Sequence, residues 1–199
     1  MNKTWPYTVA GIPDSQFVRG SVPMTKQEIR ALTMNRAKLA PGQIVWDVGA
    51  GTGSLTVEAA LLTPGGQVFA VEKNAAALVL IGENCRRFGV EHVTVVAGEA
   101  PQALVDLPAP ERVIIGGSGG HLAEILDVCA EHLLPGGFVT VNVMTVHNLA
   151  VALEKLGSPP FTGLDGIYLQ TSRLNKLGKE LFFRAENGVY VLSAQKEAQ

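Results

Sequence analysis

The chain has little of what would place it in a membrane or an oxidising compartment. Only two of its 199 residues are cysteines, Cys85 and Cys129, and two isolated cysteines make neither a disulfide framework nor a zinc site. No run approaches 18 uninterrupted apolar residues, and residues 1–17 lack the apolar core of a signal peptide. We therefore expect a cytoplasmic protein that spans no membrane and holds no metal.

Excess positive charge is also missing. Lys and Arg number 16 against 18 Asp and Glu, for a net charge of −2, so the chain has no global attraction to a polyanion and nucleic acid is not an expected partner. Hydrophobic residues make up 47% and charged residues 17%, which is typical of a packable globule. The length favours a single domain.

Short apolar runs alternate with segments of helical length. The alternation predicts a mostly parallel sheet that is covered by helices on both faces. The expected strands are 44–48, 68–72, 93–97, 112–115 and 138–143. The expected helices are 54–62, 74–88, 101–107, 122–134 and 148–156.

The two ends of the chain depart from this alternation. Thr25 and Glu28 have the spacing of a capping box, which predicts a helix over residues 25–39. Beyond the last helix, residues 167–173 alternate like a half-buried strand, and Asn187-Gly188 predicts a hairpin between 181–186 and 189–194. The sheet should therefore end in antiparallel strands, while spacing alone leaves open whether 167–173 or 181–186 pairs with the last one.

A glycine-rich loop follows the first expected strand. It reads Asp47-Val48-Gly49-Ala50-Gly51-Thr52-Gly53, so its backbone can approach a ligand closely and present free amides to it. A dinucleotide fingerprint that starts at Gly49 requires glycine at position 54, where the sequence has Ser54. The Asp47 carboxylate would also repel a pyrophosphate, and we expect it to bond loop amides. The loop thus favours a cofactor with a cationic part.

Acidic residues end the next two expected strands. Glu72 stands 23 residues beyond Gly49, close to the separation of roughly 20 expected for an acid that binds both hydroxyls of a ribose. Glu99 and Ala100 follow the third strand, where a short polar loop can bracket an adenine ring. An amide cradle, a ribose acid and an adenine clamp at three adjacent strand ends favour S-adenosylmethionine over NAD.

This combination resembles the class I S-adenosylmethionine-dependent methyltransferases over residues 44–143 and the antiparallel tail. The resemblance implies an α/β fold with a doubly wound, Rossmann-like sheet, mostly parallel with antiparallel C-terminal strands. It implies one domain over 1–199, with a covering segment at 1–24, a cofactor-binding core at 25–143, and a helix and tail at 144–199. The implied cofactor-binding residues are Thr25, Asp47, Gly49, Ala50, Gly51, Thr52, Gly53, Glu72, Glu99 and Ala100.

Two further motifs narrow the family. Residues 11–17 read Gly-Ile-Pro-Asp-Ser-Gln-Phe, and residues 116–120, after the fourth strand, read Gly-Gly-Ser-Gly-Gly. With them, the chain resembles the decarboxylating precorrin-6B methyltransferases of cobalamin biosynthesis from about residue 11 to 194. The resemblance implies methylation of carbon 15 of precorrin-6B, or of its cobalt form, with loss of the ring C acetate carboxyl group as carbon dioxide. It also implies a homotetramer.

The substrate of that family is a flat tetrapyrrole that carries many carboxylates. Glycines 116, 117 and 119 leave a bare backbone beside the methyl group, and Arg and Lys side chains can bind carboxylates. Ser118 and His121 are the candidate catalytic residues, because they follow the glycine loop and His121 can carry protons near neutral pH. The candidate substrate-binding residues are Gly116, Gly117, Gly119, Arg19, Arg173 and Lys176.

Other classes of protein would carry the same cofactor-binding loop. A tRNA adenine N-methyltransferase or a protein isoaspartyl methyltransferase would use the same cofactor loop, and a non-catalytic nucleoside-binding subunit could retain it. A tRNA enzyme should carry a basic face and, after the fourth strand, an Asn/Asp-Pro-Pro element that orients the amine. The sequence has glycines at that point, which disfavours a tRNA adenine N-methyltransferase.

Overall fold

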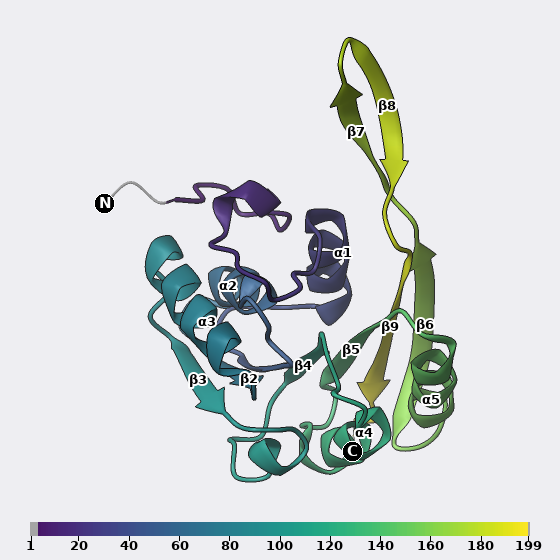
Figure 1. Ribbon diagram of the computed structural model, residues 1–199. Helices are drawn as coiled ribbons and strands as arrows, with labels where there is room; N and C mark the ends of the chain where they lie inside the picture. Colours follow the sequence, from purple (N-terminus) through teal and green to yellow (C-terminus); the bar gives the residue numbers. More distant parts are fainter. Residues whose placement is uncertain (1–3, 199) are drawn as a thin grey trace.

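The computed structural model describes residues 4–198, so the outermost residues of the ranges 1–24 and 144–199 lie outside it. Its centre is a seven-stranded sheet in the order β3-β2-β1-β4-β5-β9-β6, and β7 and β8 form a separate two-stranded sheet (Figure 1). The strands are β1 Ile44–Val48, β2 Gln67–Glu72, β3 Val93–Ala97, β4 Arg112–Ile115, β5 Phe138–Val143, β6 Phe161–Leu169, β7 Ser172–Leu177, β8 Glu180–Ala185 and β9 Val189–Lys196. The helices are α1 Gln27–Ala37, α2 Ser54–Leu62, α3 Ala75–Phe88, α4 Leu122–His132 and α5 Val146–Leu156, with 3-10 turns at Asp14–Gln16 and Gln102–Leu104.

Helices bury both faces of the sheet, because successive residues of a strand point to opposite sides. Trp46 and Val48 of β1 pack in one apolar cluster with residues of α4 and α5. Val45, between them, packs in the other cluster with residues of α1, α2 and α3. The strands β1 to β5 pair in parallel, as expected, and their carboxyl ends meet at one edge of the sheet.

The sheet ends in antiparallel strands, and their pairing shows which segment lies beside the last strand. Strand β9 lies between β5 and β6 and is antiparallel to both, so the segment that contains 167–169 is its partner. The predicted hairpin at Asn187-Gly188 is wrong, because β8 pairs with β7 instead. A close contact, not a hairpin turn, explains why position 188 is glycine: a Cβ there would lie 2.0 Å from the hydroxyl oxygen of Tyr168.

Strands β7 and β8 form a hairpin, which we call the arm, that projects away from the sheet (Figure 1). Its apolar side chains are open to solvent: Phe183 is 71% exposed and Leu177 74%. An isolated two-stranded hairpin is marginally stable in water. The arm therefore exposes apolar surface that its own chain does not cover.

The predicted capping box is also wrong. Helix α1 begins at Gln27 after Lys26 and has no side-chain cap. Glu28 accepts a hydrogen bond from Arg173 at 2.6 Å instead, and the carbonyl of Thr25 accepts from Arg30. The expected helix 101–107 is only the 3-10 turn Gln102–Leu104.

Arg30 joins the N-terminal segment to the core. Its guanidinium is fully buried and pairs with Glu58 and Asp14, both at 2.9 Å. Glu58 in turn accepts from the amides of Gly11 and Ile12 at 2.8 and 3.0 Å. A buried charge is stable only when paired and hydrogen-bonded, so this network holds residues 11–14 against α1 and α2.

Candidate active site

The glycine loop begins where β1 ends. Gly49, Gly51 and Gly53 have φ of +70°, +57° and +76°, a backbone region that side chains with a Cβ rarely adopt. Several loop amides already have protein partners: those of Gly49 and Ala50 donate to the Val71 carbonyl at 3.0 and 3.1 Å. The expectation that these amides are free for a ligand is therefore wrong. The loop contributes close backbone approach instead.

The glycine loop touches the second glycine motif, which follows β4. A Cβ on Gly49 would lie 2.3 Å from the carbonyl oxygen of Gly117. The amides of Gly116 and Gly117 both donate to the carbonyl of Val48, at 2.9 and 3.3 Å. The two loops therefore form one continuous backbone floor at the carboxyl edge of the sheet.

Glu72 shapes the site from the end of β2. One carboxylate oxygen accepts from the Gly51 amide at 2.9 Å, and the other accepts from the amides of Lys73 and Asn74 at 2.9 and 2.8 Å. These bonds connect the glycine loop to the start of α3. Because the carboxylate also lines the large cavity described below, it can accept from the hydroxyls of a ribose there.

Asp47 lies beneath the loop and is fully buried. Its carboxylate accepts from the Thr56 hydroxyl of α2 at 2.5 Å, whereas a bond to loop amides was expected. Burial raises the pKa of Asp47 to about 7, and the negative charge of Glu72 adds to the rise, while the bonds from Thr56 oppose it. Asp47 thus fixes the loop to α2 from behind.

Two adjoining cavities lie over this floor. The larger has a volume of about 770 Å³, within the range of roughly 300–1,000 Å³ for small-molecule sites. The smaller, of about 150 Å³, is lined by the loops after β3 and β4, including Glu99, Ala100 and Ser118. Glu72 and Gly119 line both. The floor and the ribose acid thus face a space of cofactor size.

The rim of the small cavity is charged. Lys73 Nζ lies 2.5 Å from a carboxylate oxygen of Glu99, and this hydrogen bond and charge lower the pKa of Glu99. His121, at the start of α4, lies 3.9 Å from Glu99 and from Glu124. Lys73 and Glu99 belong to the lining of the small cavity, whereas His121 does not, and each of the three side chains is about half exposed.

Most of the expected residues meet at these cavities. The large cavity is lined by Thr25, Gly49, Ala50, Gly51, Thr52, Glu72, Gly116, Gly117 and Gly119. The small one adds Glu99, Ala100 and Ser118. Neither lining includes Asp47, Gly53, Arg19, His121, Arg173 or Lys176.

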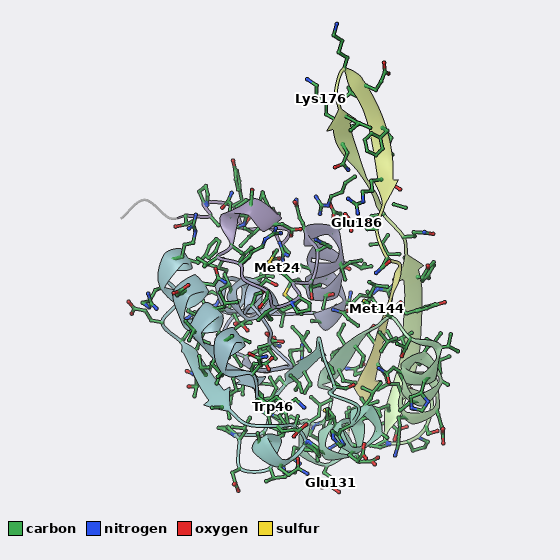
Figure 2. All side chains as sticks on the ribbon, in the orientation of Figure 1. Met24, Trp46, Glu131, Met144, Lys176 and Glu186 are labelled. Carbon is green, nitrogen blue, oxygen red and sulfur yellow. The ribbon has the colours of Figure 1, made fainter. Side chains whose placement is uncertain are left out.

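The basic residues of the tail are placed differently from the expectation. Arg173 is held by Glu28 at 2.6 Å and by Asp14 at 3.5 Å, so protein carboxylates already occupy its guanidinium. Lys176 lies out on the arm (Figure 2). A Cβ on Gly53 would lie 3.0 Å from the Cα of Ile81 in α3, so glycine at this position allows the loop and the helix to meet.

One part of the lining of the large cavity, which we call its far wall, was not predicted from the sequence. It is formed by Asn142 and Met144 at the end of β5 and by residues beside the base of the arm: Thr171, Glu186 and Asn187. Asn142 ends a parallel strand, so the rule that ligands bind at the carboxyl edge could have indicated it. No local signal marks the residues beside the arm.

The fold, the glycine floor and the acids after β2 and β3 define a class I methyltransferase of the S-adenosylmethionine-dependent type. Comparison with known proteins gives the particular family. A family model described as a precorrin methyltransferase domain matches residues 16–196. The chain belongs to this family.

Relatives agree along nearly the whole chain. A cobalt-precorrin-6B C(15)-methyltransferase (decarboxylating) of Salmonella typhimurium is 41% identical over 185 residues, 92% of this chain and 95% of that protein. A probable enzyme of the same name from Pyrobaculum calidifontis is 39% identical over 196 residues, 96% of this chain and 98% of that protein. A crystal structure of a precorrin-6y C5,15-methyltransferase from Geobacter metallireducens has a TM-score of 0.89 at 37% identity, and the match covers 96% of this chain and 100% of that one.

Proposed function

We propose that this enzyme methylates carbon 15 of cobalt-precorrin-6B, or of its metal-free form, and removes the ring C acetate carboxyl group as carbon dioxide. The observation that supports this best is the glycine floor shared by Gly49 and Gly117 beneath a large cavity. A floor without side chains admits a flat macrocycle close to a methyl donor. An amine acceptor, as in a tRNA methyltransferase, would call for a polar orienting group at that point.

S-adenosylmethionine, when bound, supplies an electrophilic methyl group on a sulfonium. We assign its ribose to Glu72, its methionine part to the loop 49–53 with Thr25, and its adenine to the small cavity beside Glu99 and Ala100. These residues fit the cofactor, since the carboxylate, the bare loop and the polar pocket adjoin along one edge. Asp47 supports the loop from behind and leaves the sulfonium charge unopposed, which suits a transfer in which that charge disappears.

Catalysis by this chain is mainly positioning. The acceptor carbon of an electron-rich tetrapyrrole is itself a nucleophile, so the protein need only hold it in line with the methyl group, an effect worth up to about 7–11 kcal/mol in well-oriented systems. We assign this placement to Gly116, Gly117, Gly119 and Ser118. Lys26 lines the same cavity and is placed to bind a substrate carboxylate.

The arm supports a homotetramer. Its apolar residues, Phe182 and Phe183 among them, are exposed, and an exposed apolar hairpin of this kind favours burial against another copy of the chain. A cytoplasmic location is part of the proposal and is consistent with two buried, unpaired cysteines, Cys85 and Cys129. Within residues 4–198 no helix is long and apolar enough to cross a bilayer.

The test is an anaerobic incubation of the protein with S-adenosylmethionine and cobalt-precorrin-6B or precorrin-6B. The product should gain the mass of one methylene and lose that of one carbon dioxide. A product that gains the methyl group and keeps its carboxyl would refute the decarboxylation. No reaction with either substrate would refute the proposed function.

A further inference from the structure

The far wall of the large cavity carries polar groups that the cofactor assignment leaves unused. Glu186 follows β8 at the base of the arm (Figure 2) and is partly buried. Its backbone amide donates to the Thr171 carbonyl at 2.9 Å, which joins the two chain segments where the arm begins. This bond fixes the backbone of Glu186 at the cavity wall, while its carboxyl group stays available.

Elimination singles out Glu186 among the carboxyl groups of this cavity. Four ionisable side chains line it: Lys26, Glu72, Lys73 and Glu186. Glu72 accepts three backbone amides, and Lys73 pairs with Glu99 at 2.5 Å. Among residues 4–198, the side chains of Lys26 and Glu186 make no hydrogen bond or ion pair within the protein. Because Glu72 is assigned to the ribose, Glu186 is the carboxyl group in this lining that is left for the substrate.

The reaction needs such a group, and this inference rests on the proposed function. Carbon 15 bonds to the methyl carbon as the carbon–sulfur bond breaks with its electron pair going to sulfur, which leaves the macrocycle cationic. The carbon–carbon bond of the acetate then breaks, carbon dioxide leaves, and its electron pair neutralises the macrocycle as an exocyclic methylene. That methylene carbon must take up a proton to become a methyl group, and one proton leaves the macrocycle for solvent.

We propose that Glu186 is the acid that donates this proton to the methylene carbon. The carboxylate that remains is reprotonated from solvent before the next turnover. His121 is less well placed for the task, because it lines neither cavity, is 47% exposed and faces Glu99 and Glu124. Glu186 instead lines the large cavity, together with Asn142 and Thr171.

The experiment is a single-turnover reaction in D₂O with S-adenosylmethionine and cobalt-precorrin-6B. Methyl transfer is followed by mass spectrometry, and deuterium at the new ring C methyl group by NMR of quenched samples. For Glu186→Gln we expect methyl transfer within about twofold of the parent rate and deuterium incorporation slowed about 100-fold, the lower end of the usual range for a general acid. Glu186→Asp should recover part of the rate, and Glu154→Gln, on the exposed side of α5, is the matched control.

The outcomes separate this proposal from the one it rests on. If the parent enzyme reacts and Glu186→Gln incorporates deuterium at the parent rate, Glu186 is not the acid, although the proposed function stands. If Glu186→Gln slows both steps equally while still binding S-adenosylhomocysteine, Glu186 binds substrate and the proposal also fails. If the parent enzyme reacts with neither form of the substrate, the proposed function and this inference fall together. Should the Gln variant not fold, the Asp variant decides by the same comparison of the two steps.

Discussion

Glu72 offers the sharpest test of the cofactor assignment. Its carboxylate accepts from the amides of Gly51, Lys73 and Asn74 at 2.8–2.9 Å, so it both positions the loop and faces the expected ribose. Glu72→Ala would remove the two hydrogen bonds that we propose to the ribose, each worth about 1.5–3 kcal/mol because the acceptor is charged. At the lower end the loss is about 3 kcal/mol, which is a weakening of more than 100-fold in Kd.

The assay is isothermal titration calorimetry with S-adenosylhomocysteine, which avoids turnover. Glu72→Gln keeps the size of the side chain and removes its charge, so we expect an intermediate loss of about tenfold. Glu91→Ala, at an exposed position outside both cavities, is the control and should bind like the parent. If Glu72→Ala binds within threefold of the parent while remaining folded, the assignment of the ribose to this edge is wrong.

Three further predictions concern the floor, the buried acid and the arm. Gly49→Ala should lower the free energy of unfolding by at least about 2 kcal/mol, because its Cβ would meet the Gly117 carbonyl oxygen at 2.3 Å. A Cβ on Gly117, by contrast, would lie 3.7 Å from the Gly49 carbonyl oxygen, so Gly117→Ala should change the free energy of unfolding by under about 1 kcal/mol. Urea unfolding of the two variants measures both values, and equal losses would contradict the argument. Because burial raises the folded-state pKa of Asp47 from 3.8 to about 7, its contribution to stability is complete below pH 4, is lost as the pH rises to 7 and is flat above. Relative to Asp47→Asn, the parent should thus lose up to about 4 kcal/mol between these limits, and a pH-independent difference would refute the shift. Phe183→Ser should weaken the oligomer with little effect on the fold, since the ring is 71% exposed; light scattering that shows an unchanged tetramer, or a parent that is monomeric, would refute the role of the arm.

The central sheet could be predicted because its signals are local. Strands 44–48, 93–97, 112–115 and 138–143 agree with the structure residue for residue, since short apolar runs rich in β-branched residues are a local signal for strands. The same alternation places Gly49, Glu72 and Ala100 after parallel strands, and hence at one edge. Predicting which residues lie at that edge requires no knowledge of contacts between distant side chains.

The missed features all depend on contacts between distant segments. Asn187-Gly188 is a strong hairpin signal by itself, yet the pairing of β9 with both β5 and β6 overrides it. Glu28 leaves its capping role because Arg173, far along the chain, offers a charged partner. Glu186 likewise joins the cavity lining only through the placement of the arm base, which no local pattern encodes.

The backbone contact between Gly49 and Gly117 limits how this scaffold can change. Two loops from different strands meet there with no side chain between them, so position 49 cannot accept a larger residue unless the loop at Gly117 withdraws. New acceptor specificity must therefore arise elsewhere in the cavity lining, for example at Asn142 and Met144. The contact at Gly49 holds the two loops at one separation, whatever changes elsewhere in the cavity.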